Sequence, residues 1–211
     1  KTAVTGLLSS GLSGYSLNHS DIGGYTTVPS PVSWLISHRY RSKELMQRWT
    51  ELNAFTTIFR THEGNRPEAN HQFNTDEDTL DHFARFANIY KAWAGYRKQL
   101  VKDAAQKGHP VVRHPWVHYP NDDAVRLLEY QFMIGADFMV APVLDPGSAS
   151  VDVYLPKGSW THLFTGQVHS HAQGKSIAVA APIGTPAVFY KTESKPGEQF
   201  RQRLLTEGLI E

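Results

Sequence analysis

One carboxylate near the start of the chain lies in a setting that could do chemistry. Asp21 belongs to the segment GYSLNHSDIGGYTT, residues 14–27, and stands between polar residues and the pair Gly23-Gly24. A strand that ends in a carboxylate followed by two glycines suits the C-terminal rim of a β/α barrel, where loops assemble active sites. Glycines at such a rim adopt unusual dihedral angles and let a ligand approach closely. The local pattern alone favours a plainer interpretation, in which Asp21 is a turn residue that hydrogen-bonds its own backbone.

A second pair of functional side chains lies in FRTHEGNRP, residues 59–67. Arg60 and His62 are two positions apart, so a strand places them on one face. Both can donate hydrogen bonds to hydroxyl oxygens, and Arg60 can also pair with a carboxylate and fix its orientation. The plainer interpretation is a salt-bridged strand end that binds no ligand.

Residues beside these two motifs are further candidates. Tyr25 and His19 flank Asp21, where they could tune its carboxyl or touch a substrate. For His19, the favoured role is the orientation of neighbouring loops. The charged loop at residues 63–66 either rims the same pocket or is simply solvated.

Two histidine pairs raise the question of a metal ion. His114 and His118 are four residues apart, and His169 and His171 are two residues apart. A metal-dependent barrel hydrolase needs His and Asp ligands that converge from several strand ends. The second pair lies outside the candidate barrel strands, so we expect the histidines to be packed or solvated and the chain to hold no metal.

Composition excludes several classes of function. The 211 residues are 40% hydrophobic, and 21 Lys and Arg balance 20 Asp and Glu, which gives a net charge of +1. This balance offers no electrostatic case for a nucleic acid or a membrane surface as partner. No apolar run approaches the ~20 residues that span a bilayer. The absence of cysteine excludes disulfides and a cysteine nucleophile and fits a reducing cytoplasm. The chain opens at Lys1 in a stretch that is typical of the middle of a folded unit, so we expect a piece of something longer.

The first two thirds of the chain alternate between strand and helix patterns. Helices are predicted at 2–13, at 42–54 with Ser42 as N-cap, at 76–106 after a cap at Thr75, and from 122. The predicted helix at 76–106 should end before Gly108. Its core side, which faces the barrel, should carry Phe83, Phe86, Tyr90 and Trp93. Strands are predicted at 17–22, 55–62 and 111–119. The alternation favours parallel βαβ units.

The pattern changes near residue 137. Short apolar runs at 138–144, 151–155, 160–163, 177–181 and 186–190 are separated by turn residues, which predicts an antiparallel β module. A terminal helix is predicted at 201–209. We therefore divide the chain into residues 1–136, with the βαβ pattern, and residues 137–211, with the β pattern.

Several phrases of the sequence resemble one family. GLSGYSLNHSDIGGYTT, SKELMQRWTELNAFT and FRTHEGNRP, in this order, are similar to the later part of the catalytic barrel of glycoside hydrolase family 31, the α-glucosidase family. The nearest likeness is to its sulfoquinovosidase branch. VAPVLDPG, VDVYLPKGSWTHLFTG and APIGTPAVFYK resemble the sandwich that follows that barrel. The resemblance implies the C-terminal portion of a (β/α)₈ TIM barrel at 1–136, followed by an antiparallel β-sandwich module at 137–211.

The resemblance also implies roles for the candidate residues. The aspartate that matches Asp21 is the general acid/base of the family, and the histidine that matches His62 hydrogen-bonds sugar hydroxyls. Arg60, Tyr25 and His19 are further candidates for substrate binding. The implied reaction, in carbohydrate metabolism, is hydrolysis of an α-glycoside with retention, with an α-sulfoquinovoside as the favoured substrate. No cofactor is required.

A retaining mechanism needs a second carboxylate about 5–5.5 Å from the first. No segment of this chain matches the family's nucleophile, so we expect the missing N-terminal half of the enzyme to supply it, together with the arginine and tryptophan that bind the sulfonate. The phenol and guanidinium groups of HRYR, residues 38–41, could bind a sulfonate, but a surface charge cluster is favoured. Two alternatives remain: an α-glucosidase of the same family without sulfonate specificity, and a non-catalytic fragment that binds sugar.

Overall fold

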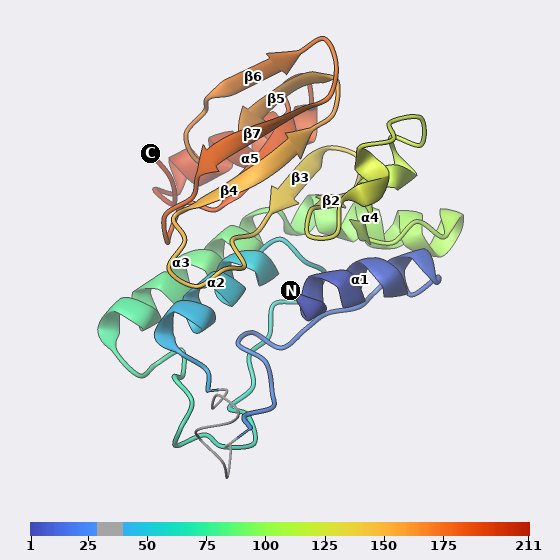
Figure 1. Ribbon diagram of the computed structural model, residues 1–211. Coiled ribbons are helices and arrows are strands. Elements are labelled where there is room, and N and C mark those ends of the chain that lie inside the picture. Colours follow the sequence, from blue (N-terminus) through green and yellow to red (C-terminus); the bar gives the residue numbers. More distant parts are fainter. Residues whose placement is uncertain (29–39) are drawn as a thin grey trace.

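The computed structural model describes residues 1–28 and 40–211 (Figure 1). Four helices lie beneath a β-rich upper part, and the connection between the second and third helices reaches the lower end of the molecule. The helices are α1 (Thr2–Leu12), α2 (Lys43–Asn53), α3 (Glu77–Ala92) and α4 (Ala94–Lys107). None of the helices in the described ranges is long and apolar enough to cross a membrane.

Helix ends follow the predicted signals, with two differences. The Ser42 hydroxyl accepts a hydrogen bond from the Leu45 N–H, as the N-cap prediction requires. The cap of α3 is Asp76 rather than Thr75, because the Asp76 carboxylate accepts the Thr79 N–H at 2.8 Å. The single helix predicted at 76–106 is two helices, because the backbone turns at Trp93, whose buried indole donates to the Ala54 carbonyl.

The predicted barrel strands are the largest difference. Within the described residues, the segments 17–22 and 55–62 form no regular strand and share one parallel bridge, between Ile22 and Thr61. The Ile22 N–H donates to the Arg60 carbonyl at 2.8 Å, so the two segments still run side by side. A parallel strand becomes regular only when it is paired along its length, and here the pairing is limited to this bridge.

The segment predicted as a strand at 111–119 is also mostly irregular. It contains β1 (Val112–Arg113), after which Pro115 opens a 3₁₀ helix at Pro115–Val117. A second 3₁₀ helix, Val125–Leu127, replaces the helix predicted from residue 122. Proline fixes its own φ and lacks an N–H, so it ends the strand early.

The antiparallel module is confirmed. A six-stranded sheet has the order β1-β2-β3-β8-β5-β6, and β4 pairs with β7 in a two-stranded sheet. The strands are β2 (Phe132–Ile134), β3 (Phe138–Ala141), β4 (Ser150–Leu155), β5 (Gly158–His162), β6 (Val168–His171), β7 (Lys175–Ala180) and β8 (Ala187–Lys191). Strands β2 and β6 were not predicted. Residues 132–134 follow the segment that was assigned to a helix from residue 122, and the VHSH pattern of β6 carries too little apolar character to mark an edge strand. The predicted terminal helix is α5 (Lys195–Thr206).

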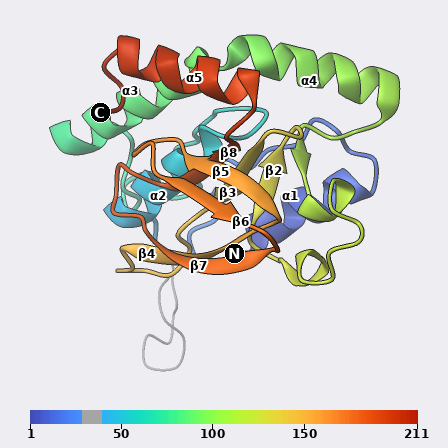
Figure 2. The same cartoon turned by 90° about the horizontal axis from the view of Figure 1, so that it is seen from above.

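The six-stranded sheet is covered on both faces. The β4–β7 pair lies on one side, and α5, α3 and α4 lie on the other (Figure 2). Residues of β3 alternate between the two cores, since Phe138 and Val140 join the helix-side cluster while Met139 joins the cluster with Trp160. The predicted aromatic stripe of α3 also packs inward: Phe86 is fully buried, and the Tyr90 ring stacks on Phe59 at 5.4 Å.

The division of the chain at residue 136/137 stays a prediction. Strands β1 and β2 precede this point, and they pair with β3 in the same sheet.

Candidate active site

The two predicted motifs meet at Asp21. The Arg60 Nε atom lies 2.9 Å from Asp21 Oδ1, and the His19 Nε2 atom lies 3.7 Å from the same oxygen. The Asp21 side chain is 19% exposed, while that of Arg60 is 54% exposed. Residues 19, 21 and 60 therefore form one polar cluster in which the carboxyl is the most sheltered group.

One oxygen of this carboxyl is shielded and accepts no hydrogen bond. Asp21 Oδ1 has almost no solvent-exposed surface and no hydrogen-bond partner in the described part of the chain. Arg60 Nε is close enough to attract it, but its N–H is not aimed at the oxygen, so the contact is an ion pair only. A carboxyl in this state keeps hydrogen-bonding capacity for a further partner.

The glycine pair forms a turn with the backbone of Asp21. The Gly24 N–H donates to the Asp21 carbonyl at 2.9 Å, and both glycines have positive φ angles, +82° at Gly23 and +74° at Gly24. A Cβ atom at Gly23 would lie 2.5 Å from the Arg41 Cδ atom. Gly23 thus permits both the left-handed conformation and the close approach of the Arg41 side chain.

Helix α2 holds the residue before Asp21. The Asn53 side chain, which is fully buried, donates to the Ser20 carbonyl at 2.5 Å. The Trp49 indole donates to the Ser20 hydroxyl at 2.9 Å. These two contacts fix the backbone one residue before the carboxyl.

The predicted pair of sugar-binding residues, His62 and Tyr25, lies in ring contact. Their centroids are 4.9 Å apart in an edge-to-face arrangement. The His62 Nδ1 atom accepts the Gly64 N–H at 3.1 Å, which places the proton of the neutral ring on Nε2, a donor with no hydrogen bond to the residues that the structure describes. The Tyr25 side chain is exposed, and its carbonyl accepts the Asn65 N–H.

Sequence reasoning missed Arg41. The stretch HRYR was expected to be a surface charge cluster, but Arg41 is only 4% exposed, so that interpretation is wrong for this residue. Residues 38 and 39 lie outside the described residues. Arg41 donates to backbone carbonyls that are 17 to 21 positions away in the sequence, and no local pattern signals such contacts.

The loop after His62 acts mainly on the backbone. Asn65 accepts the Thr27 N–H at 2.7 Å and donates to the Thr27 carbonyl, so it closes the two loops together. The sequence left open whether this loop rims the pocket or is simply solvated. The contacts of the Asn65 side chain are structural, since they hold backbone groups.

The paired histidines have other partners. His114 accepts the Trp116 N–H and contacts the Leu128 carbonyl at 2.9 Å, and His118 lies 3.0 Å from an Arg113 nitrogen. Across residues 1–28 and 40–211, no three His, Cys, Asp or Glu side chains are grouped so that they could hold a metal ion.

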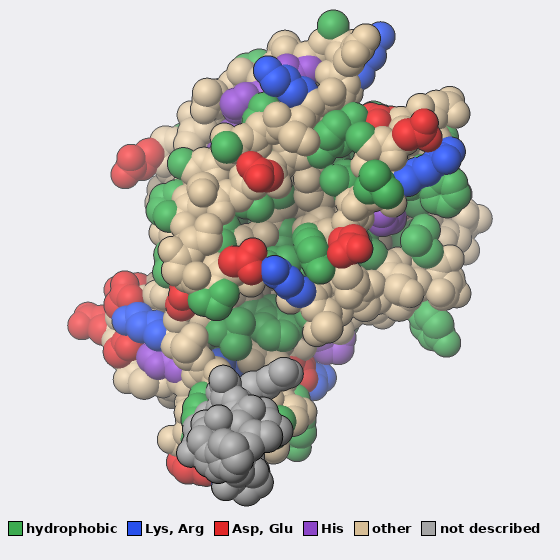
Figure 3. Space-filling model, in the orientation of Figure 1, with side chains coloured by type: hydrophobic (Ala, Val, Ile, Leu, Met, Phe, Trp, Pro, Cys, Tyr) green, Lys and Arg blue, Asp and Glu red, His purple; other side chains and the backbone are tan. Residues whose placement is uncertain are grey.

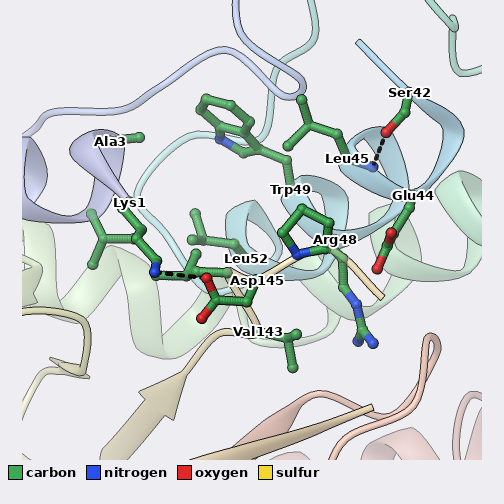
Figure 4. A pocket seen from close by; sticks show the side chains of 13 residues that line it. Lys1, Ala3, Ser42, Glu44, Leu45, Arg48, Trp49, Leu52, Val143 and Asp145 are labelled. Atoms are coloured by element: carbon green, nitrogen blue, oxygen red, sulfur yellow. Dashed lines mark hydrogen bonds and ion pairs between the residues drawn. The ribbon is translucent and has the colours of Figure 1, made fainter. Parts of the chain in front are cut away.

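A small cavity lies on the other side of Trp49. It has a volume of about 110 Å³ and is lined by residues of α1, α2 and the β3–β4 connection (Figure 4). The Lys1 ammonium and the Asp145 carboxylate meet across it at 2.7 Å. On this face of the molecule, apolar side chains gather between the β-rich part and the lower loops (Figure 3). Asp21 does not line this cavity.

Two family models match the chain in succession. The glycosyl hydrolases family 31 TIM-barrel domain matches residues 1–102, and the glycosyl hydrolase family 31 C-terminal domain matches residues 108–194. The matches leave a gap of a few residues and cover most of the sequence.

Two curated relatives and one solved structure are similar over nearly the whole chain. The sulfoquinovosidase of Agrobacterium fabrum is 45% identical over 95% of this chain, and that of Escherichia coli is 41% identical over 92%. A family 31 sulfoquinovosidase from E. rectale, solved with an aza-sugar inhibitor, superposes with a TM-score of 0.87 at 39% identity over 96% of this chain. The chain spans 29%, 27% and 29% of the lengths of these proteins, respectively.

Proposed function

Since the chain belongs to glycoside hydrolase family 31 and carries the C-terminal part of its TIM barrel followed by its β module, we propose that the whole protein hydrolyses α-sulfoquinovosides with retention. Asp21 is the general acid and then the general base in this proposal. The identities of 45% and 41% with two sulfoquinovosidases support the choice of substrate.

The state of the Asp21 carboxyl is the observation that carries the proposal. A group that protonates a glycosidic oxygen must be partly dry and must have a free oxygen. Asp21 is mostly shielded, and its Oδ1 atom makes no hydrogen bond within the described residues. When the proton has left, the Arg60 guanidinium at 2.9 Å attracts the carboxylate that forms. That carboxylate then removes a proton from the attacking water in the second step.

The second carboxylate is proposed to come from the missing N-terminal half of the enzyme. A retaining pair requires the nucleophile about 5–5.5 Å from the acid/base. The chain spans 29% of the length of its relative from Agrobacterium fabrum, so most of the barrel lies outside it. Asp21 is thus one member of a pair that the complete barrel brings together.

The remaining candidates are assigned to the sugar. His62 has an Nε2–H donor, and Tyr25 lies against its ring with an exposed side chain. Arg60 has donors beyond Nε, and the His19 Nε2 atom lies 3.7 Å from the same Asp21 oxygen. We assign these four side chains to the recognition of sugar hydroxyls and to the orientation of Asp21. The chemistry uses no cofactor. A cytoplasmic location is part of the same proposal.

The test compares two leaving groups in the full-length enzyme. Asp21→Asn should lower kcat/KM for an alkyl α-sulfoquinovoside by about 10²–10⁴, the usual contribution of proton transfer. The loss for a 4-nitrophenyl α-sulfoquinovoside should be far smaller, because that leaving group departs without a proton. Asp123→Asn is the matched control, since the Asp123 side chain is 89% exposed and lies far along the chain. Equal losses on the two substrates would exclude the acid role.

A further inference from the structure

The Arg41 guanidinium is buried among backbone carbonyls of two different loops. It donates to the Gly23 carbonyl at 3.2 Å and to the Gly24 carbonyl at 2.6 Å, both just after Asp21. It also donates to the His62 carbonyl at 2.8 Å. The fourth contact is the side-chain oxygen of Gln72, at 3.2 Å.

The backbone around this side chain is shaped to receive it. Gly23 and Gly64 both have positive φ angles, +82° and +86°. A Cβ atom on Gly23 would lie 2.5 Å from Arg41 Nε, and one on Gly64 would lie 3.4 Å from Arg41 Nη2. Gly23 thus leaves no room for a Cβ atom beside the guanidinium. At Gly64 a Cβ atom would first meet the Asn70 side chain, at 2.6 Å.

Arg41 differs from the other groups that hold the Asp21 segment. Asn53 and Trp49 fix Ser20 from helix α2, and the backbone bridge joins Ile22 to Thr61. Arg41 bonds the carbonyls directly after Asp21 and the carbonyl of His62 itself. Asn65 and Asn70 also join the two loops, but farther from Asp21, at Thr27. A planar fork with five N–H groups can span both loops, which a single ammonium cannot do.

We propose that Arg41 is a positioning residue that sets the distance between the proton donor Asp21 and the sugar-binding residue His62. The inference rests on the proposed function. Arg41 touches neither the sugar nor the reacting atoms. It acts through the carbonyls of Gly23, Gly24 and His62, whose loops carry the two functional side chains.

Loss of the fork should therefore affect proton donation more than folding. A displacement of about 1 Å in a catalytic group costs about 10²-fold in rate. Arg41→Lys keeps the positive charge but cannot bond all three carbonyls. In the full-length enzyme, this variant should lower kcat/KM for an alkyl α-sulfoquinovoside by about 10²-fold. The loss for the 4-nitrophenyl substrate should be much smaller, since that reaction does not depend on the placement of the proton.

The matched control is a second buried arginine that also holds backbone. Arg113 is 4% exposed, like Arg41, and donates to the Pro110 carbonyl at 2.6 Å, away from the Asp21 cluster. Arg113→Lys should change both substrates equally. Arg41→Ala should recover part of its activity on the alkyl substrate when free guanidinium is added, whereas Asp21→Asn should not. Gln72→Met, which removes one half-buried partner of Arg41, should show a smaller loss with the same dependence on leaving group.

The outcomes separate this inference from the function on which it rests. Suppose that Arg41→Lys and Gln72→Met each lose activity equally on the two substrates, and that guanidinium does not rescue Arg41→Ala. Arg41 then only supports folding, and the inference is overturned. If Asp21→Asn shows its expected dependence on leaving group in the same series, the proposed function stands in that case. If Asp21→Asn loses that dependence as well, both proposals fall.

Discussion

The β-rich part of the chain, residues 112–206 including the terminal helix α5, and the segments around Asp21 differ in where their backbone partners lie. Strand β3 pairs with β2 on one side and with β8 on the other. The segments 17–22 and 55–62 share a single bridge. Large apolar side chains near these segments are exposed, including Tyr15 at 69% and Leu17 at 55%. The strands of the β-rich part thus pair with one another within this chain, whereas the described segments around Asp21 are joined by one bridge.

The largest expected effect is on the chain in isolation. We expect the 211-residue chain by itself to dimerise or aggregate, because open strand edges and exposed apolar surface favour association. Light scattering after size exclusion measures this directly. Hydrogen exchange should show protected amides in β3, β5 and β8 and unprotected ones at 17–22 and 55–62, and the full-length enzyme should protect both sets. A monodisperse monomer that melts cooperatively would contradict the comparison.

The same difference explains how much of the fold could be predicted. Most strands of the module were predicted from short apolar runs and turn residues, because each strand carries this pattern in its own sequence. The pairing of distant strands, such as β3 with β8, was not predicted. Residues 55–62 have the composition of a strand, but their regularity depends on neighbours that composition cannot reveal. The break at Trp93 arises from a tertiary hydrogen bond to Ala54, so a helical pattern could not show it.

The candidate site was predictable to a similar extent. The contact of Asp21 with Arg60 joins residues 39 positions apart, and both were singled out because their motifs resemble a known family. Arg41 was not found, since a charged residue in a charged stretch gives no sign that it is buried. Its partners are backbone carbonyls, which every sequence contains.

The contact of α2 with α3 and Gly184 offers a second comparison, because it contains two groups with opposite responses to pH. The Glu51 carboxylate accepts the Gly184 N–H at 2.5 Å and pairs with Arg48 at 3.1 Å. Burial raises the pKa of Glu51 to about 7, and this effect outweighs the opposing contributions of these partners. The His82 Nε2 atom lies 3.8 Å from Glu51, and burial lowers the pKa of His82 to about 4.

The two pKa shifts make the stability of the fold change in opposite directions with pH. An unfolded glutamate has a pKa of 4.5, so folded Glu51 holds an extra proton up to about pH 7. Its contribution stabilises the fold below pH 4.5 and is lost as the pH rises to about 7. An unfolded histidine has a pKa of 6.5, so the contribution of His82 is present above pH 6.5 and is lost as the pH falls to about 4. Between pH 4.5 and 6.5 the two contributions oppose each other.

Single substitutions should separate these contributions. Glu51→Gln leaves His82 alone, so the melting temperature of the full-length protein should fall more steeply than in the wild type as the pH is lowered from 6.5 to 4.5. His82→Gln leaves Glu51 alone, so the melting temperature should fall more steeply as the pH is raised from 4.5 to 7. Circular dichroism at constant ionic strength follows both. The double variant is the control and should have a flatter profile than either, and slopes of the opposite sign would refute the assignment.

The smallest effects concern two serine caps, one in each region. Ser42 caps α2 in an exposed position, where its hydroxyl accepts the Leu45 N–H. Ser194 caps α5 by accepting the Gly197 N–H, but it is 8% exposed and also donates to the Asp137 carboxylate at 2.8 Å. The two residues thus make the same local contact in different surroundings.

Replacement by alanine should therefore cost more in the β-rich part. Ser42→Ala should lower the free energy of unfolding by about 1 kcal/mol, the usual value for a lost cap. Ser194→Ala should lower it by about 2–3 kcal/mol, because a partly buried carboxylate loses a hydrogen bond as well. Urea unfolding of the two variants of the full-length enzyme measures the difference. The double variant Ser194→Ala, Asp137→Asn tests its origin, since an amide tolerates the missing hydroxyl better than a charge does. Equal losses for the two serines would mean that the β-rich part is no more tightly bonded at its helix ends than the half that carries Asp21.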